Sequence, residues 1–279
     1  MAIDAQKLPV TIIKPRPKWK LVDFREIKSY RDVFAALVMR EIRTRYKQTV
    51  LGGLWAILQP FATMIVFSLF FGKLAKMPSY NVPYPIFSYA ALVPWLYFST
   101  ALTNASISLT SNQAFISKVY FPRLAIPLAP VIARLLDFVI AFLVLLGMMV
   151  YFGIAPTISI MLLPVLTFSM VLCALGVGMW LAALNVQYRD VSYIVPFIVQ
   201  LWMFVSPIVY PMSMIPKKFQ LLYALNPMAG VIEGFRSALL GKPEFPWIPV
   251  GMSLLISGVL LLSSLVFFRR MERYFADVV

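Results

Sequence analysis

Few side chains in this 279-residue sequence are able to do chemistry, and they lie far apart. Histidine, the commonest general base and metal ligand, does not occur. The single cysteine, Cys173, lies in an apolar stretch, which excludes a disulfide framework and a CxxC metal site. No GxxxxGK(S/T) phosphate-binding loop occurs, and the Gly-Lys pair at 241–242 is followed by Pro243. The sequence therefore predicts no catalytic residue, metal site or cofactor on this chain.

Two pairs of opposite charges have the spacing of neighbours on a helix. Arg134 precedes Asp137 by three residues in an otherwise apolar stretch. An ion pair near the inner end of a helix is favoured there over a proton relay, because relays usually need several carboxylates or histidines. Glu233 and Arg236 are also three residues apart, and we expect them to pair with each other or to contact water.

The elements that carry these residues belong to a membrane protein. Hydrophobic residues make up 61% of the chain and charged residues 13%, with a mean hydropathy of +0.84. A soluble domain has roughly 45–50% apolar and about 25% charged residues. The composition therefore predicts an all-α integral membrane protein.

Long stretches free of charged residues locate the membrane spans, because about 20 apolar residues cross the hydrocarbon core. The stretch from Phe138 to Tyr188 is too long for one helix, and the break at 152–156 (Phe-Gly-Ile-Ala-Pro) divides it. We expect six transmembrane helices, near residues 48–72, 87–110, 125–152, 158–184, 191–216 and 245–268.

A shorter apolar segment, 219–232, is too short to cross a membrane and suits a re-entrant or interfacial helical hairpin that turns at Asn226-Pro227. The predicted organisation is a cytoplasmic tail (1–28), an amphipathic interface helix (29–48), a six-helix transmembrane domain (49–268) and a second cytoplasmic tail (269–279).

The basic residues predict the orientation of the chain. With six spans and an inside N-terminus, most of the 25 lysines and arginines fall on the cytoplasmic side, as the positive-inside rule requires. Both termini are then cytoplasmic. Membrane topology explains much of the net charge of +14, so the charge does not call for a nucleic-acid partner.

Residues 29–48 have the pattern of a helix that lies in the membrane interface. Phe34, Val38, Ile42 and Tyr46 recur every four residues. Three arginines are available to its polar side: Arg40, Arg43 and Arg45. Such a helix either anchors the chain on anionic lipid or also packs against a partner protein, and the sequence does not separate the two.

Two inside loops combine aromatic and basic residues, the types that anchor protein interfaces. The first loop, 112–123, contains Phe115, Lys118, Tyr120, Phe121, Pro122 and Arg123. The second, 185–191, contains the adjacent pair Arg189-Asp190. Each is either a docking site for a partner protein or an ordinary interfacial connection.

Four segments in this order resemble the membrane subunits of ABC-2 type ABC transporters. Within that group the sequence is similar to the polysaccharide and polyol-phosphate export permeases, and especially to the O-antigen exporters of the Wzm kind. The segments are 43–55 at the entry to the first span, 119–127 in the first inside loop, 188–191 in the second, and 226–228 with Glu233 and Arg236 before the last span. The resemblance covers residues from about 30 to about 270.

The resemblance implies a homodimer of six-helix subunits in the bacterial inner membrane, docked on two copies of a cytoplasmic ABC ATPase that binds ATP and Mg²⁺. A lipid-linked glycan would pass through the shared pore. The first loop, and less directly Arg189 and Asp190, would transmit the movement of the ATPase. The hairpin residues Asn226, Pro227, Glu233 and Arg236 would either flank an extracytoplasmic gate or simply stabilise the hairpin.

Aromatic residues make up 15% of the chain, and an aromatic pore wall would let sugars slide. The candidates are Trp95, Tyr97, Phe204 and Tyr210, with lipid contact as the alternative for each.

A related exporter of teichoic acid, capsule polymer, lipid or drug is the alternative function. A membrane-embedded transferase is disfavoured because there is no DD or DxxD motif near a membrane face, and a passive channel because no filter loop or charged ring is visible.

Overall fold

A computed structural model describes residues 29–47, 52–116, 121–241 and 244–272. These parts of the chain contain helices and turns, without a strand. The predicted tail 1–28, the final residues 273–279 and the loop residues Lys118 and Tyr120 lie outside the described residues.

Five helical stretches are long and apolar enough to cross a membrane: Gly52–Leu74, Tyr84–Ser111, Ala125–Tyr151, Ile158–Gln187 and Trp247–Met271. They are built from η1 (Gly52–Leu54), α3 (Trp55–Phe67), η2 (Ser68–Leu74), α4 (Tyr84–Ser111), α6 (Ala125–Ala133), α7 (Leu135–Tyr151), η3 (Ile158–Leu162), α8 (Leu163–Gln187) and α12 (Trp247–Met271). The all-helical membrane fold is confirmed, and these stretches coincide with five of the six expected spans.

The remaining expected span, 191–216, forms a shorter helix than its composition suggests. Helix α9 (Val191–Val205) has 15 residues, and Ser206 leaves the helical conformation with φ −98° and ψ 150°. Pro207 explains this early end, because a proline disfavours the helical conformation in the residue before it. At 1.5 Å per residue the helix is about 22 Å long, shorter than a typical hydrocarbon core.

A pair of helices follows η4 (Met212–Met214): α10 (Lys217–Tyr223) and α11 (Pro227–Leu239). They meet at the predicted turn, where the Asn226 side chain accepts a hydrogen bond of 3.1 Å from the Met228 amide and Pro227 opens the second helix. Every residue of α11 is buried, and the helix runs beyond the predicted limit of the hairpin at 232.

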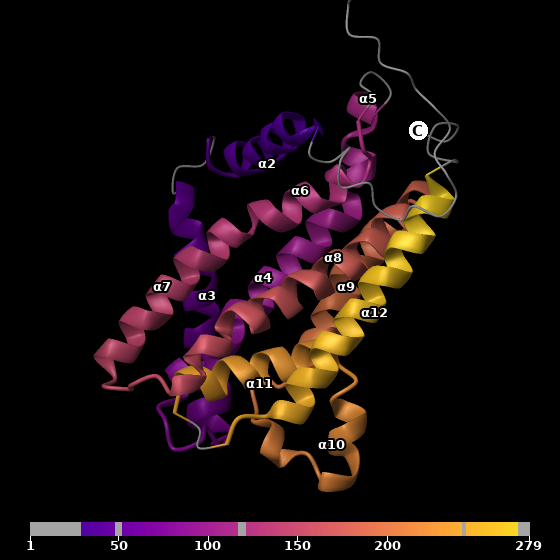
Figure 1. Ribbon diagram of the computed structural model, residues 1–279. Coiled ribbons are helices and arrows are strands. Elements are labelled where there is room, and N and C mark those ends of the chain that lie inside the picture. The colour runs from indigo at the N-terminus through magenta and orange to yellow at the C-terminus, as the bar shows by residue number, and fades with distance from the viewer. Residues whose placement is uncertain (1–28, 48–51, 117–120, 242–243, 273–279) are drawn as a thin grey trace, which may run out of the picture.

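The two ends of the molecule carry different elements (Figure 1). Helix α2 (Arg31–Tyr46) lies across one end, together with α5 (Gln113–Ile116) and the C-terminal end of α12. Helices α10 and α11 occupy the opposite end. We call these the α2 end and the hairpin end.

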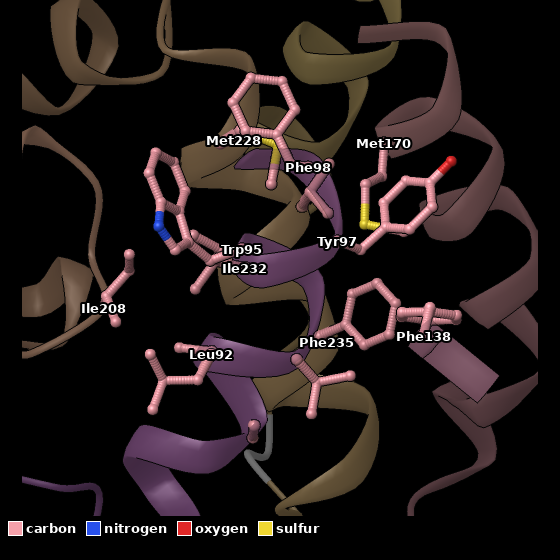
Figure 2. Packing of buried hydrophobic residues seen from close by; sticks show 14 of the residues in the cluster. Leu92, Trp95, Tyr97, Phe98, Phe138, Met170, Ile208, Met228, Ile232 and Phe235 are labelled. Atoms are coloured by element: carbon pink, nitrogen blue, oxygen red, sulfur yellow. The ribbon is translucent and has the colours of Figure 1, made fainter. Parts of the chain in front are cut away.

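Helix α4 forms the centre of the subunit. In its most apolar 18-residue window, 83% of the residues are buried inside the protein, against 22–33% in the other four candidate spans. Figure 2 shows Trp95, Tyr97 and Phe98 of α4 among side chains from α7, α8 and α11. The ring centroids of Tyr97 and Phe138 are 5.7 Å apart. The middle of the subunit is therefore a packed core.

Close helix contact holds α11 in this core. A Cβ atom added to Gly230 would lie 2.1 Å from the carbonyl oxygen of Pro249 in α12. The main chains of α11 and α12 therefore approach each other as only a glycine permits.

Candidate functional sites

At the α2 end, one carboxylate joins two helices. Asp137, in the first turn of α7, lies with Oδ2 3.1 Å from Nη1 of Arg134 and 3.3 Å from Nε of Arg45 in α2. The hydroxyl of Tyr46 donates a hydrogen bond to the other oxygen, Oδ1. Burial, reinforced by this hydrogen bond to the carboxylate, raises the pKa of Tyr46 to about 12, so the phenol stays protonated at neutral pH.

The expected pair of Arg134 and Asp137 is confirmed, but the sequence analysis missed Arg45 and Tyr46 as its partners. The sequence pattern predicts only that Arg45 lies on the polar side of an interface helix and Tyr46 on its apolar side, and it does not indicate a contact with α7. No spacing rule connects residues 91 positions apart.

The other two arginines predicted for this helix differ in their surroundings. Arg40 donates a hydrogen bond to Oδ1 of Asn112, the buried residue that ends α4, and lies 3.5 Å from Glu41. Arg43 is exposed on α2. The helix thus contacts the end of α4 and α7 through side chains for which the sequence predicts contact with lipid or a partner protein.

In the first inside loop, the aromatic side chains turn inward. The rings of Phe115 and Phe121 are 4.9 Å apart, and Phe121 is only 4% exposed. Pro122 is buried as well, and Arg123 donates a hydrogen bond of 2.7 Å to the carbonyl of Glu272 at the end of α12. The expectation that Phe121 and Pro122 face a partner is therefore corrected, because both side chains pack within the subunit.

The second inside loop presents its charges outward. Arg189 and Asp190 are exposed between α8 and α9. Of the predicted docking residues that the structure describes, this pair is the most accessible. Its contact with a partner stays a prediction.

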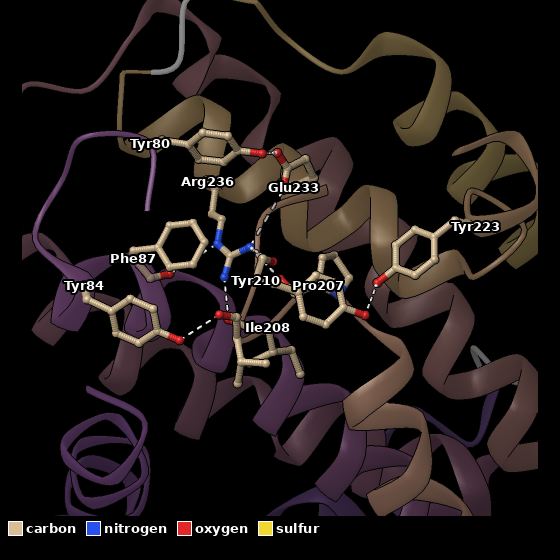
Figure 3. A network of polar contacts seen from close by, with 10 residues as sticks. Tyr80, Tyr84, Phe87, Pro207, Ile208, Tyr210, Tyr223, Glu233 and Arg236 are labelled. Atoms are coloured by element: carbon tan, nitrogen blue, oxygen red, sulfur yellow. Dashed lines mark hydrogen bonds and ion pairs between the residues drawn. The ribbon is translucent and has the colours of Figure 1, made fainter. Parts of the chain in front are cut away.

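At the hairpin end, Arg236 is buried where α9 breaks (Figure 3). Its guanidinium donates hydrogen bonds of 2.5 Å to the carbonyls of Pro207 and Ile208 and one of 3.2 Å to that of Phe87. The group also lies 3.6 Å from the centroid of the Phe87 ring. Burial lowers the pKa of Arg236 to about 10, which leaves it charged at neutral pH.

These hydrogen bonds give donors to backbone carbonyls that have no helical partner after α9 ends. Non-helical backbone inside a membrane protein must find partners for its carbonyl groups. Besides Pro207 and Ile208, Arg236 reaches the carbonyl of Tyr210 at 3.3 Å, and the Tyr84 hydroxyl donates to that of Val209 at 2.7 Å. All four carbonyls from 207 to 210 are therefore paired with buried or half-buried side chains.

Of the two arrangements expected for Glu233 and Arg236, the ion pair is confirmed and contact with water is not. Both side chains are buried, with Oε2 of Glu233 3.8 Å from Nη1 of Arg236. The Tyr80 hydroxyl donates a 2.5 Å hydrogen bond to Oε1 of Glu233. The sequence spacing identified the pair but not its burial, which follows from the complete enclosure of α11.

Asn226 and Tyr223 link the hairpin to the end of α9. The indole of Trp202 donates a 2.9 Å hydrogen bond to Asn226, whose amide in turn donates to Ser206 at 3.0 Å. The hydroxyls of Tyr210 and Tyr223 are 3.1 Å apart. The hairpin and the broken end of α9 are thus one connected unit.

The four aromatic candidates for a pore wall have different positions. Trp95 and Tyr97 are 2% and 3% exposed in the central core, so the expectation that they line a pore is corrected. Phe204 is 51% exposed on α9, and Tyr210 is half-buried with its hydroxyl bonded to the Phe204 carbonyl. Tyr193 and Phe197, which the sequence analysis did not select, are exposed on α9 as well. The sequence around these two residues is uniformly apolar, so it does not indicate which side of α9 is exposed.

Comparison with known proteins gives consistent matches along most of the chain. Residues 32–240 match the family described as ABC-2 type transporter. The O-antigen export system permease protein RfbA of Myxococcus xanthus is 32% identical over 90% of this chain and 96% of its own length. RfbA of Klebsiella pneumoniae is 28% identical over 88% and 95%. The polysialic acid transport protein KpsM of Escherichia coli is 29% identical over 74% and 80%.

Proposed function

Because the chain belongs to the ABC-2 type transporter family, we propose that it forms the membrane path of an ATP-driven exporter of a lipid-linked, O-antigen-like polysaccharide. The chain is a multi-pass inner-membrane transport subunit rather than an enzyme. Two copies form the pore, and two copies of a cytoplasmic ABC ATPase bind ATP and Mg²⁺ and drive it.

The packed centre of the subunit is the main observation that supports a homodimeric pore. Helix α4 and the aromatic side chains around it fill the middle of the described bundle. A hydrated polymer needs a wide path, and opening one through this core would separate well-packed side chains. The path therefore lies outside the single subunit, against a second copy of the chain.

Helix α9 supports the same proposal. Only Val195 and Val199 of this helix are buried, so most of its surface is not covered by the other helices of the subunit. Its open surface carries Tyr193, Phe197 and Phe204, whose rings offer sugars a smooth apolar contact. In the proposed dimer this surface faces the polymer or the second subunit.

The α2 end is the cytoplasmic end in this proposal. The many basic residues of α2 and of the inside loops support this orientation, because cytoplasmic segments carry an excess of lysine and arginine. The ATPase would contact the exposed Arg189 and Asp190, the outer side of α5 and the exposed side of α2. The hairpin end, held together around Arg236, is the extracytoplasmic exit.

Transport into inverted inner-membrane vesicles tests the proposal. Vesicles that contain the chain, its ATPase subunit and a radiolabelled lipid-linked O-polysaccharide should protect the polymer from an added glycosidase only when ATP is present. Vesicles without the ATPase, or with its phosphate-binding lysine replaced, are the controls. Protection that is independent of ATP or of the ATPase would refute the proposal, and native mass spectrometry should give a two-plus-two complex.

An acidic or capsule-type polymer is the second candidate substrate, favoured by the similarity to the polysialic acid transport protein KpsM and to the capsule polysaccharide export inner-membrane protein CtrC of Neisseria meningitidis. The same vesicles decide between the two when an acidic, lipid-anchored capsular polymer replaces the O-polysaccharide. Faster protection of the capsular polymer would favour this second substrate.

A further inference from the structure

Asp137 of α7 forms the ionic contact that connects α7 to the C-terminal end of α2. It is the only acidic residue between Ala125 and Tyr151, and its side chain is 16% exposed. Arg134 approaches it from the adjoining turn, and Arg45 and Tyr46 approach it from α2. Glu41 of α2 lines the same small cavity between the helices, so the cluster contains two acidic and two basic side chains.

The geometry of this contact restrains the end of α2 in more than one direction. Arg45 and Tyr46 are adjacent, so their side chains leave the helix about 100° apart, yet they bind different oxygens of one carboxylate. Oδ2 of Asp137 faces the charged groups of Arg45 and Arg134, while Oδ1 accepts from the neutral Tyr46 hydroxyl, so both oxygens are engaged from defined directions. Arg40, just over one turn earlier, is bonded to Asn112 of α4. Two polar contacts, to two different helices, therefore add to the packing of α2 along α6 and orient its C-terminal half.

Apolar packing of α2 is concentrated in the part of the helix that precedes Arg40. Among the described residues of α2, Leu37 is the only one that is fully buried. It joins a cluster with Leu109, Phe121 and Ile126, and the half-buried side chains of Val33, Phe34 and Val38 pack against the same cluster. The C-terminal turn of α2, which continues toward α3, is held chiefly by the charged contacts at Asp137.

We propose that Asp137 is a positioning residue for coupling: it holds the end of α2 to α7, so that force applied to α2 by the ATPase moves the transmembrane bundle. The proposal rests on the proposed function, because it needs an ATPase that acts at the α2 end. Without the carboxylate, α2 remains tethered through the chain and through the apolar cluster around Leu37, but its last turns move independently of α7.

The first test needs neither ATPase nor substrate. Hydrogen–deuterium exchange of α2 peptides is measured on the purified chain in lipid nanodiscs, for the wild type and for Asp137→Asn. The amides of the last two turns of α2 should exchange at least about tenfold faster in the variant, because local opening exposes them. Asp32→Asn is the matched control, since Asp32 forms only an exposed pair with Arg31 on the same helix, and its exchange should equal that of the wild type.

Arg45→Gln should reproduce the effect of Asp137→Asn, and the two together should add little to either alone, because they remove one shared contact. Unchanged exchange in Asp137→Asn, or fully additive effects of the pair, would overturn the proposal whatever the chain transports.

The second test separates coupling from mere folding. In vesicles with the ATPase, Asp137→Asn should raise the ATP hydrolysed per polymer exported by about tenfold, with the amount of assembled complex unchanged. Asp137→Glu, which keeps the charge, should restore most of the ratio. An unchanged ratio in Asp137→Asn despite faster α2 exchange would also overturn the proposal. If the wild type shows no ATP-dependent export, the proposed function fails, while the exchange experiment still decides whether Asp137 holds α2.

Discussion

Replacing Arg236 with methionine is expected to unfold the hairpin end of the subunit. Methionine fills a similar volume but donates no hydrogen bond, so the non-helical carbonyls of Pro207 and Ile208 lose their partner. An unsatisfied buried acceptor costs about 1–3 kcal/mol. The buried carboxylate of Glu233 also loses its cation at 3.8 Å, and breaking a buried ion pair typically costs about 3–5 kcal/mol.

We therefore expect a loss of at least about 3 kcal/mol, a large share of the roughly 5–15 kcal/mol that stabilises a folded domain. Arg236→Lys should be intermediate, because one ammonium keeps the charge but does not reach carbonyls on both sides as the guanidinium fork does. Adding Glu233→Gln to Arg236→Met should recover part of the loss, since it removes the stranded charge.

Heating the detergent-solubilised protein and measuring the fraction that remains monodisperse on size-exclusion chromatography gives the comparison. Arg189→Met is the matched control, because it removes the same group from an exposed position and should melt as the wild type does. If Arg236→Met melted together with the Arg189→Met control, our explanation of how the broken end of α9 is stabilised would be wrong.

Three further predictions follow from local packing and exposure. Gly230→Ala should sharply reduce the yield of folded protein, because the new Cβ would clash with the α12 main chain. Gly258→Ala is the control and should be tolerated, because the space around Gly258 is open. In-gel fluorescence of the expressed variants compares the two yields. Phe121→Ala should lower thermal stability by up to about 3–5 kcal/mol through the cavity left beside Phe115, and equal melting curves would contradict this packing. Arg189→Glu should leave melting unchanged but weaken co-purification of the ATPase, and undiminished binding would remove this loop from the proposed contact.

The positions of most helices follow directly from the sequence. Charged residues are so rare that uninterrupted apolar stretches mark the spans, and the predicted break at 152–156 falls between the end of α7 at Tyr151 and the start of η3 at Ile158. The Asn226-Pro227 turn also follows from local chemistry, because an asparagine cap and a proline at the first helical position are both short-range signals.

The contacts between distant residues could not be predicted in this way. In a membrane protein, side chains that face lipid and side chains that face the core are equally apolar, so α4 gave no sign that Trp95 and Tyr97 point inward. The role of Arg236 depends on carbonyls freed 29 residues earlier by Pro207, and local spacing suggested only its pair with Glu233.

The location of the polymer path is the central claim, and photo-crosslinking tests it directly. A photoreactive phenylalanine is placed at Phe204, on the open side of α9, or at Trp95, in the core of the subunit. Illumination during ATP-driven transport of a labelled O-polysaccharide should give a polymer adduct at position 204 and none at position 95. Adducts at position 95 with none at position 204 would mean that the path runs through the subunit itself.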